Sequence, residues 1–251
     1  MRTYGQFCPV AKAAEIFAER CTPLIIRELY SGSTRFNEVK SGVPGISGSL
    51  LAQRLRMLVD VGVVDRRQPD GGRLIQYVLT PQGLELIPAI QLLGEWGMRW
   101  LERDIEVADL QPQLLMWDMH KRVVLDRLPR ERVVVQVDFT GHRTVTIWLV
   151  LERPEPSVCD HDPGFEVDLF VSADTLTIHR VWMGLLSWRS ALSDGLITFQ
   201  GPPAYRRDFP DWFRLNHFSN VAIPIAAGWP IRPDRNQARN RGCNHGDPQI
   251  P

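Results

Sequence analysis

The chain has 251 residues, of which 44% are hydrophobic and 23% charged, and its 29 Lys/Arg and 29 Asp/Glu residues cancel to a formal net charge of zero. At ~100–200 residues per domain, this length predicts two domains of a soluble globular protein. No apolar run approaches the ~18–20 residues that a membrane-spanning helix needs, and the start of the chain contains no signal-peptide core. We therefore expect a cytoplasmic protein with no membrane partner.

The cysteines are scattered along the chain. Cys8, Cys21, Cys159 and Cys243 form neither the CxxC pairs of a zinc site nor the dense pattern of a disulfide-stapled domain. This distribution fits a reducing compartment.

Three short helices are predicted at the start of the chain, over residues 9–20, 22–30 and 36–40. Pro9 stands at the first position of the first helix, and Thr22 followed by Pro23 is the usual pair of an N-cap and a proline that starts a helix. Pro44-Gly45 then predicts a turn.

A fourth helix is predicted over residues 47–60. Ser47 is placed to cap it, and an apolar stripe recurs at helical spacing on one face, at Leu51, Leu55 and Leu58. At about 100° per residue, the opposite face carries polar side chains. These are Ser49, Gln53 and Arg56, with Arg54 on the flank.

A β-hairpin is predicted after this helix. Two extended runs, residues 63–68 and 73–79, flank the tip Pro69-Asp70-Gly71-Gly72, a typical hairpin signal. Arg66, Arg67 and Arg73 lie beside the tip. Thr80-Pro81 then starts a last long helix, which we expect to reach about residue 103 with a bend at Pro88.

This order of elements is that of a winged helix-turn-helix domain, mainly α with a β-hairpin wing. A helix fits the major groove of B-DNA, where serine, glutamine and arginine reach base edges, and a basic hairpin contacts phosphates or the minor groove beside it. A simpler alternative is that Arg54 and Arg56 only solvate an ordinary helix. The residues predicted to contact a double-stranded DNA operator are Arg35, Ser47, Ser49, Gln53, Arg54, Arg56, Arg67 and Arg73.

The second half is predicted to be an α+β domain. Apolar residues recur at period two in three strands, around residues 133–139, 145–151 and 165–171. The sheet therefore has one well-buried face, which helical pieces would cover. These pieces are predicted over about 114–125, 174–183, 187–194 and 202–213. Residues 229–251, rich in Pro, Arg, Asn and Gly, are predicted to be a disordered tail.

No strong catalytic motif is visible. The run Cys159-Asp160-His161-Asp162 contains metal-ligand residue types, but adjacent residues on an extended segment point in different directions, which favours a polar turn. The histidines show no spacing relation to one another. We expect neither an enzyme nor a metal or other cofactor.

Several motifs occur in a fixed order: CPVAKA (8–13), LIIREL (24–29), RFNEV (35–39), PGIS (44–47), LLAQRLRML (50–58), GVV (62–64) and YVLTPQG (77–83). With them, residues 4–101 resemble the HxlR-type winged-helix regulators, a branch near the MarR group. The resemblance implies a dimeric transcription factor whose helix 47–60 enters the major groove. Cys21 departs from the family, which usually has tryptophan before the position of Thr22.

The predicted last helix carries an apolar stripe of Leu92, Leu93, Trp96 and Trp100, with Gly94 and Gly97 leaving room for a close neighbour. Such a stripe either packs within the chain or forms an interface. Because the resembling family dimerises through its terminal helices, the resemblance favours a dimer contact.

Cys8 stands at a helix N-terminus, where the helix dipole favours a thiolate. Some relatives of this type use a cysteine in the matching motif to sense oxidants. The alternative is a small, partly buried residue.

Residues 105–228 carry more large aromatic side chains than a small core requires, which suits a thick core or an apolar cavity. In the stretch 162–203, a strand, a helix, Gly184, a second helix and the run DGLITFQG resemble a sterol-carrier-protein-type domain. In that fold a sheet and helices enclose an apolar tunnel. The resemblance implies a hydrophobic ligand bound by Trp148, Phe170, Trp182, Leu186, Trp188, Phe199 and Trp212.

We therefore expect a DNA-binding domain at 1–104, a ligand-binding domain at 105–228 and a tail at 229–251. The whole would be a homodimeric transcriptional regulator that responds to a hydrophobic small molecule. Two alternatives stay open: a carrier of lipid-like ligands, and a regulator whose second domain is only structural. An enzyme acting on a hydrophobic substrate is a third, for which no nucleophile, base or metal set is visible.

Overall fold

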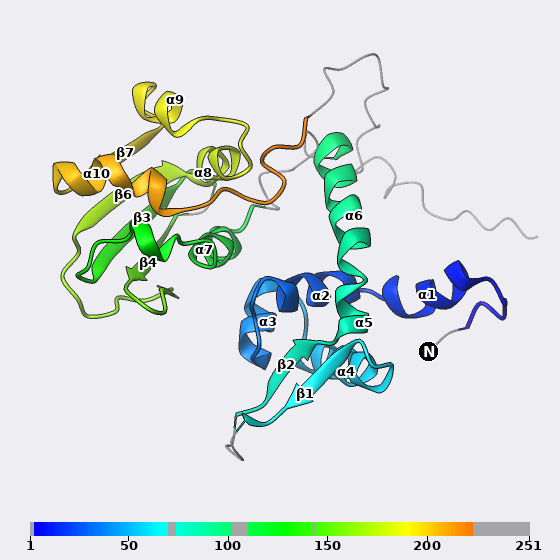
Figure 1. Ribbon diagram of the computed structural model, residues 1–251. Coiled ribbons are helices and arrows are strands. Elements are labelled where there is room, and N and C mark those ends of the chain that lie inside the picture. The colour runs from blue at the N-terminus through cyan, green and yellow to red at the C-terminus, as the bar shows by residue number, and fades with distance from the viewer. Residues whose placement is uncertain (1–2, 70–73, 102–109, 143, 223–251) are drawn as a thin grey trace, which may run out of the picture. The chain divides into compact units, whose positions relative to one another are not determined.

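Figure 1 shows the computed structural model, which describes residues 3–69, 74–101, 110–142 and 144–222. The predicted hairpin tip from Asp70 to Gly72, Arg73, most of the segment that joins the two halves and the predicted tail 229–251 lie outside the described residues. None of the described helices is long and apolar enough to span a membrane.

The first part of the chain is helical apart from one antiparallel pair of strands, β1 and β2. Its elements are α1 (Pro9–Phe17), α2 (Thr22–Tyr30), α3 (Phe36–Gly42), α4 (Gly48–Asp60), β1 (Val64–Arg67), β2 (Gln76–Leu79), α5 (Pro81–Leu84) and α6 (Ile87–Trp100). This order confirms the predicted winged helix-turn-helix.

Two predicted helix starts are confirmed in detail. The Ser47 hydroxyl accepts a hydrogen bond from the backbone N–H of Leu50 at 3.2 Å, and the Thr80 hydroxyl accepts one from Gly83 at 3.1 Å. Each bond satisfies an amide that the first turn of a helix leaves without a partner.

The prediction that Thr22 caps the second helix is wrong. Cys21 precedes α2 in the left-handed region, at φ 70°, and Thr22 is already the first helical residue. The Thr22 side chain is fully buried, and its hydroxyl has no hydrogen-bond partner among the described residues. The cap failed because the chain turns one residue earlier than the Thr-Pro pair predicts.

The single bent helix predicted from Thr80 to about residue 103 is also wrong. The structure contains two helices there, α5 and α6, separated at Glu85 and Leu86. A proline ring clashes with the carbonyl four residues before it and supplies no N–H, so Pro88 acts on Leu84, where α5 ends. Pro88 thus breaks the helix and lies in the first turn of the next one.

The second part of the chain is a five-stranded sheet with helices, as predicted for an α+β fold. The strand order is β5-β4-β3-β6-β7, with β3 and β6 parallel and the other pairs antiparallel. Its elements are α7 (Pro112–His120), η4 (Leu125–Arg127), β3 (Val133–Thr140), β4 (Val145–Leu151), β5 (Ser157–Cys159), β6 (Leu169–Asp174), α8 (Thr175–Trp182), α9 (Trp188–Ser193), β7 (Ile197–Gln200), α10 (Pro203–Asp208) and η5 (Phe209–Trp212).

One face of this sheet is buried, as its alternation predicted. Val135 and Val137 of β3 and Leu149 of β4 belong to one buried cluster that also contains residues of α7, α8, α9 and η5, so these helices cover the same face. The third strand begins at Leu169 rather than at Phe165, since its pairing with β3 starts at Leu169 opposite Val135. The Phe165 ring instead packs under the Arg132 guanidinium, whose Cζ lies 3.7 Å from the ring centroid.

Residues Met1–Val221 form one compact unit with two clusters of buried apolar side chains. The first cluster is built from α2, α4 and the strands of the wing, and the second from the sheet and its helices. The division into domains at 1–104 and 105–228 stays a prediction.

Candidate nucleic-acid interface

Helix α4 has one buried face and one exposed face. Leu51, Leu55 and Leu58 are at most 1% exposed and pack into the first core. Gln53 and Arg56 are exposed, and within the described residues no hydrogen bond or ion pair holds either side chain. A glutamine and an arginine on one exposed helix face supply the donors and acceptors that read bases in a major groove.

The two serines at the start of α4 are linked to each other. The hydroxyl oxygens of Ser47 and Ser49 lie 3.1 Å apart, while Ser47 also caps the helix. Both side chains are exposed, so Ser49 lies on the same side of the helix start as the cap.

Arg54 is held inside the domain. Its Nη2 lies 2.5 Å from the Glu19 carboxylate, its Nε donates to the Arg20 carbonyl at 3.2 Å, and its side chain is only 13% exposed. The sequence placed Arg54 on the flank of the helix but gave no sign of this partner, which lies 35 residues earlier.

Two of the remaining predicted DNA contacts, Arg35 and Arg67, are exposed arginines. Arg35 precedes α3 and pairs with Glu38 at 3.6 Å, and Arg67 on β1 pairs with Asp65 at 2.8 Å. Both pairs are solvent-exposed and so are weak enough to exchange for a phosphate contact. Arg73 lies outside the described residues.

The structure does not gather the seven predicted ligand-binding residues around one cavity. Trp182 and Trp212 are fully buried in the core of the second part. Trp188 and Phe199 pack against that core, with their ring centroids 6.1 Å from each other. Leu186 also packs there. Phe170 is 39% exposed. Gln136 of β3 is in register with Phe170 of β6 on one side and with Trp148 of β4 on the other. Phe170 and Trp148 therefore lie on the sheet face opposite to the buried core.

The other candidate groups have local roles. Asp160 and His161 form an exposed pair at 2.8 Å, and Asp162 accepts a bond from Gly164, as in a polar turn. Burial and the nearby Asp160 raise the pKa of the Cys159 thiol. No three His, Cys, Asp or Glu side chains of the described residues are arranged to hold a metal ion. Cys8 is half-buried before Pro9 and makes no capping bond.

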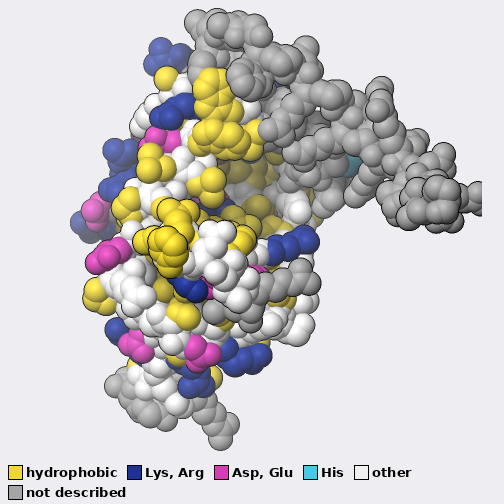
Figure 2. All heavy atoms as spheres, turned by 90° about the vertical axis from the view of Figure 1, so that its right-hand side faces the viewer, with side chains coloured by type: hydrophobic (Ala, Val, Ile, Leu, Met, Phe, Trp, Pro, Cys, Tyr) yellow, Lys and Arg dark blue, Asp and Glu magenta, His cyan; other side chains and the backbone are white. Residues whose placement is uncertain are grey.

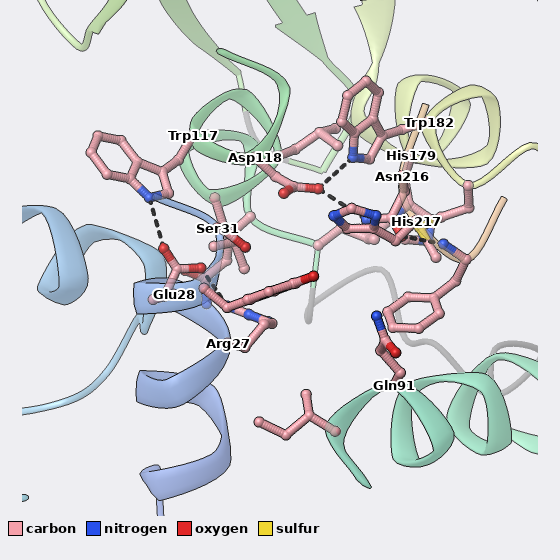
Figure 3. A pocket seen from close by; sticks show the side chains of 18 of the residues that line it. Arg27, Glu28, Ser31, Gln91, Trp117, Asp118, His179, Trp182, Asn216 and His217 are labelled. Atoms are coloured by element: carbon pink, nitrogen blue, oxygen red, sulfur yellow. Dashed lines mark hydrogen bonds and ion pairs between the residues drawn. The ribbon is translucent and has the colours of Figure 1, made fainter. Parts of the chain in front are cut away.

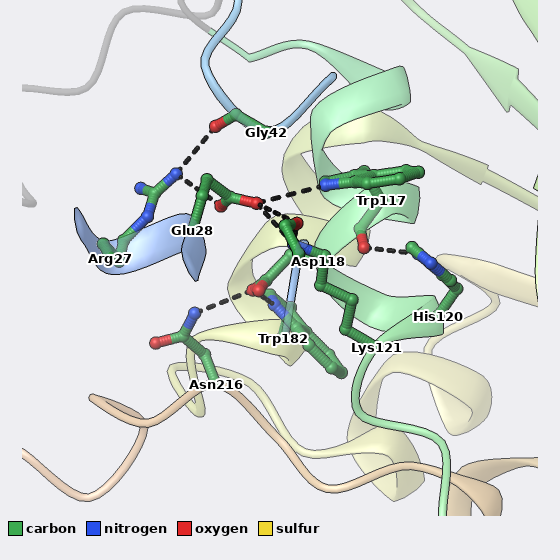
Figure 4. A network of polar contacts seen from close by, with 10 residues as sticks. Arg27, Glu28, Gly42, Trp117, Asp118, His120, Lys121, Trp182 and Asn216 are labelled. Carbon is green, nitrogen blue, oxygen red and sulfur yellow. Dashed lines mark hydrogen bonds and ion pairs between the residues drawn. The ribbon is translucent and has the colours of Figure 1, made fainter. Parts of the chain in front are cut away.

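A buried polar network was missed by the sequence analysis (Figure 4). Glu28 of α2 is 5% exposed and pairs with Lys121, which follows α7, while Arg27 donates to Glu28 at 2.9 Å and Trp117 donates to it at 3.3 Å. Burial raises the pKa of Glu28, but the charges of Lys121 and Arg27 lower it more, so the pKa lies below its usual value. One sequence signal could have indicated the network: Glu28 lies three residues after Ile25, and this helical spacing places the glutamate on the buried side of α2.

Comparisons with known proteins agree with this arrangement. Residues 16–105 match the family model described as HxlR-like helix-turn-helix. The HTH-type transcriptional regulator YvaP of Bacillus subtilis is 35% identical over 100 residues, which make up 39% of this chain and 93% of that protein. YodB, an HTH-type transcriptional regulator of the same bacterium, is 32% identical over 97 residues, 38% of this chain and 87% of that protein.

A solved structure, the reduced form of YodB from B. subtilis, is 31% identical to this chain and covers 39% of it and 98% of the YodB chain, with a TM-score of 0.34. The matched relatives are named as HTH-type transcriptional regulators. The chain belongs to the HxlR-like helix-turn-helix family of DNA-binding transcriptional regulators.

Proposed function

We propose that this protein binds its operator as a homodimer through α4 and the wing, and that a hydrophobic small molecule bound by its second domain modulates that binding. The observation that carries the proposal is the exposed polar face of α4, set on a fully buried leucine stripe beside a basic hairpin. The buried stripe fixes the orientation of the helix, so the side chains of Ser49, Gln53 and Arg56 always face outward.

The base-reading residues in this proposal are Ser49, Gln53 and Arg56. Glutamine suits the edge of adenine, and arginine suits the edge of guanine. Ser47 would contact a phosphate beside its cap, and Arg35, Arg67 and Arg73 would contact the backbone. Arg54 has a different role in this proposal. Its ion pair with Glu19 ties α4 to the segment that follows α1, so Arg54 positions the helix that reads the bases.

The test starts with selection of operator sequences from random DNA by the full chain. Gln53→Ala should then lose about 1–3 kcal/mol of affinity for the selected operator and almost none for unrelated DNA. Gln113→Ala, at an exposed glutamine of α7, is the matched control. Arg67→Ala should weaken all DNA alike and reduce the salt slope by about 1. Wild-type operator affinity in both the Gln53 and Arg67 variants would refute the interface.

The homodimer is supported by two apolar helix faces. Helix α1 buries no residue: its Val10 is 75% exposed, and Phe7, which lies just before the helix, is 99% exposed. On α6 the predicted stripe is also exposed, with Leu92 at 65%, Leu93 at 52%, Trp96 at 47% and Trp100 at 50%. Figure 2 shows hydrophobic side chains gathered on the side of the molecule where α1 and α6 lie. Apolar faces of this extent in one chain favour burial against a second copy.

Gly94 and Gly97, predicted to leave room for a neighbour, differ in their surroundings. A Cβ built on Gly94 would lie 2.1 Å from the ring of Phe218. Gly94 therefore leaves room for the Phe218 ring of the same chain. Among the described residues, nothing lies within 4 Å of a Cβ on Gly97. Gly97 is thus the glycine that keeps a close approach open for a partner helix.

A ligand role for the second domain is supported by its architecture, in which helices cover one face of a five-stranded sheet, as in sterol-carrier-type domains. A purely structural domain remains the alternative. Compounds that bind the full chain and change operator affinity favour the sensor, whereas tight binding without any change in operator affinity favours the structural role.

Cys8 is kept as a candidate oxidant sensor because its thiol precedes Pro9 at the start of α1, beside the proposed dimer face. Faster alkylation of Cys8 than of a model thiol at neutral pH, with loss of operator binding after mild peroxide, would support this role. Cys8→Ser is the matched control, since it should bind the operator before and after peroxide.

A further inference from the structure

A pocket of about 350 Å³ lies between α2 and α6 on one side and α7 and α8 on the other (Figure 3). Its size falls at the lower end of the ~300–1,000 Å³ typical of small-molecule sites. This pocket is not the predicted aromatic tunnel, because Trp182 is the one residue of the seven predicted ligand-binding residues that lines the pocket. We propose that this pocket binds a hydrophobic amine, with the ammonium group on Asp118.

The walls supply the apolar half of such a ligand's site. Ile87 and Ile90 come from α6, Leu114 and Trp117 from α7, and Phe218 from the segment that packs on Gly94. An alkyl or aromatic body placed among them would exchange water contacts for these side chains, at roughly 25 cal/mol for each Å² of apolar surface removed from water.

Asp118 supplies the polar half. Its Oδ2 accepts hydrogen bonds from the Trp182 indole at 2.6 Å and from the Asn216 amide at 3.0 Å. Figure 3 shows the carboxylate with both donors at the wall of the pocket. Both donors are neutral, and no hydrogen bond of the described residues ends on Oδ1. Asp118 interacts electrostatically with Arg122 and His217, but among the described residues neither of these two forms a salt bridge with it. A protonated amine would bind this carboxylate directly, through a charge-assisted hydrogen bond.

The cations around Asp118 are engaged with other groups. Arg122 donates through Nε to the carbonyls of Arg214 and Leu215, and Lys121 pairs with Glu28. Arg27, which also lines the pocket, is bound to Glu28 and to the carbonyl of Gly42. An anionic ligand would therefore have to displace an existing bond of Arg27, whereas a cationic one finds Asp118 hydrogen-bonded only to neutral donors among the described residues.

The position of the pocket gives binding a route to the DNA. Helix α2 leads through Ser31 to Arg35 and α3, and α6 carries the proposed dimer face. A ligand that packs differently in the DNA-competent and incompetent arrangements shifts operator affinity by that difference and no more. This step rests on the proposed ligand-responsive function, whereas the site itself does not.

The site is tested with three probes of one skeleton, octylamine, 1-octanol and octanoate, titrated into the full chain while the emission of tryptophan is followed. Octylamine should bind most tightly. Asp118→Asn keeps an oxygen acceptor for Trp182 and Asn216, and should weaken octylamine at least tenfold while changing 1-octanol less than threefold. Asp126→Asn, at an exposed aspartate of η4, is the matched control. Circular dichroism confirms that both variants are folded.

A second variant tests the location. Leu114→Trp fills the pocket and should weaken octylamine and 1-octanol together, whereas Leu196→Trp, at an exposed leucine, should change neither. Equal affinity for the three probes, or octylamine binding that is indifferent to both Asp118→Asn and Leu114→Trp, would overturn the site.

Operator affinity measured in the same samples separates the two proposals. Binding of octylamine that depends on Asp118 and leaves operator affinity unchanged supports the site and refutes ligand-responsive regulation. A change in operator affinity caused by octanoate and retained in Asp118→Asn supports regulation and overturns the amine site.

Discussion

Two threonine hydroxyls near helix starts have opposite surroundings. The Thr80 hydroxyl donates to the Gly62 carbonyl at 2.6 Å and accepts from Gly83. The Thr22 hydroxyl is buried without a partner among the described residues. A buried hydroxyl without a hydrogen bond is destabilising, whereas a capping hydroxyl stabilises the helix that it starts.

Thr22→Val should therefore leave the free energy of unfolding unchanged or raise it by up to about 1 kcal/mol, because the apolar isostere removes an unsatisfied group. Thr80→Val makes the same chemical change and should lower the free energy of unfolding by about 1–2 kcal/mol. Urea denaturation of the full chain measures both. A loss in Thr22→Val as large as that in Thr80→Val would mean that the Thr22 hydroxyl has a partner.

At the scale of elements, the exposed face of α6 should hold two chains together. Leu93→Glu places a charge on this face, and burying that charge against an apolar partner should weaken self-association at least tenfold, or about 1.4 kcal/mol. Leu84→Glu makes the same change at a leucine of α5 that is 48% exposed and outside the stripe. Sedimentation velocity over a range of protein concentrations measures the dissociation constant. Equal effects of the two variants would place the interface elsewhere.

The elements that the sequence predicted well are those with short-range causes. Ser47 caps α4 three residues before its partner amide, and the leucines of α4 repeat within three turns. The strands of the wing, β1 and β2, pair in register close together in the sequence, from Val64 opposite Leu79 to Arg67 opposite Gln76. Each of these signals lies within a window that a sequence pattern covers.

The features that the sequence did not predict depend on contacts between distant residues. Arg54 is paired with a glutamate 35 residues earlier, and Lys121 with a glutamate 93 residues earlier. The periodicity of the second half correctly placed apolar side chains on one sheet face, but it could not distinguish a closed core from a cavity. That distinction depends on how Trp188, Phe199 and Trp212 interlock.

At the scale of the whole molecule, the contact between Glu28 and Lys121 joins α2 to the residue that follows α7. Gly42 permits it, because a Cβ there would lie 2.0 Å from the Glu28 carboxylate. A buried, fully hydrogen-bonded charge pair is costly to break from one side, so it favours one arrangement of α2 and α7 over others.

Two groups at this contact make stability depend on pH in the same direction. The pKa of Glu28 is lowered in the folded protein, so its contribution is complete above its unfolded pKa of about 4.5 and is lost as the pH falls through the folded value. The Nδ1 atom of His120 lies 2.5 Å from the carbonyl oxygen of Trp117. Burial lowers the pKa of His120 below its usual 6.5. Below about pH 6.5 the unfolded chain therefore binds a proton that the folded chain resists.

The unfolding temperature should consequently decrease when the pH is lowered from 7.5 to 5.5. In this range His120 titrates in the unfolded state, whereas Glu28 does not yet titrate. His120→Gln removes the titrating group, so its unfolding midpoint should depend less on pH over this range, even if the loss of the bond to Trp117 lowers the midpoint at both values. His161→Gln, at a histidine whose side chain is 82% exposed, should keep the wild-type dependence. Burial also lowers the pKa of His217, so a residual slope should remain in His120→Gln and disappear in the double variant with His217→Gln. A wild-type slope in that double variant would show that acid acts on another part of the molecule.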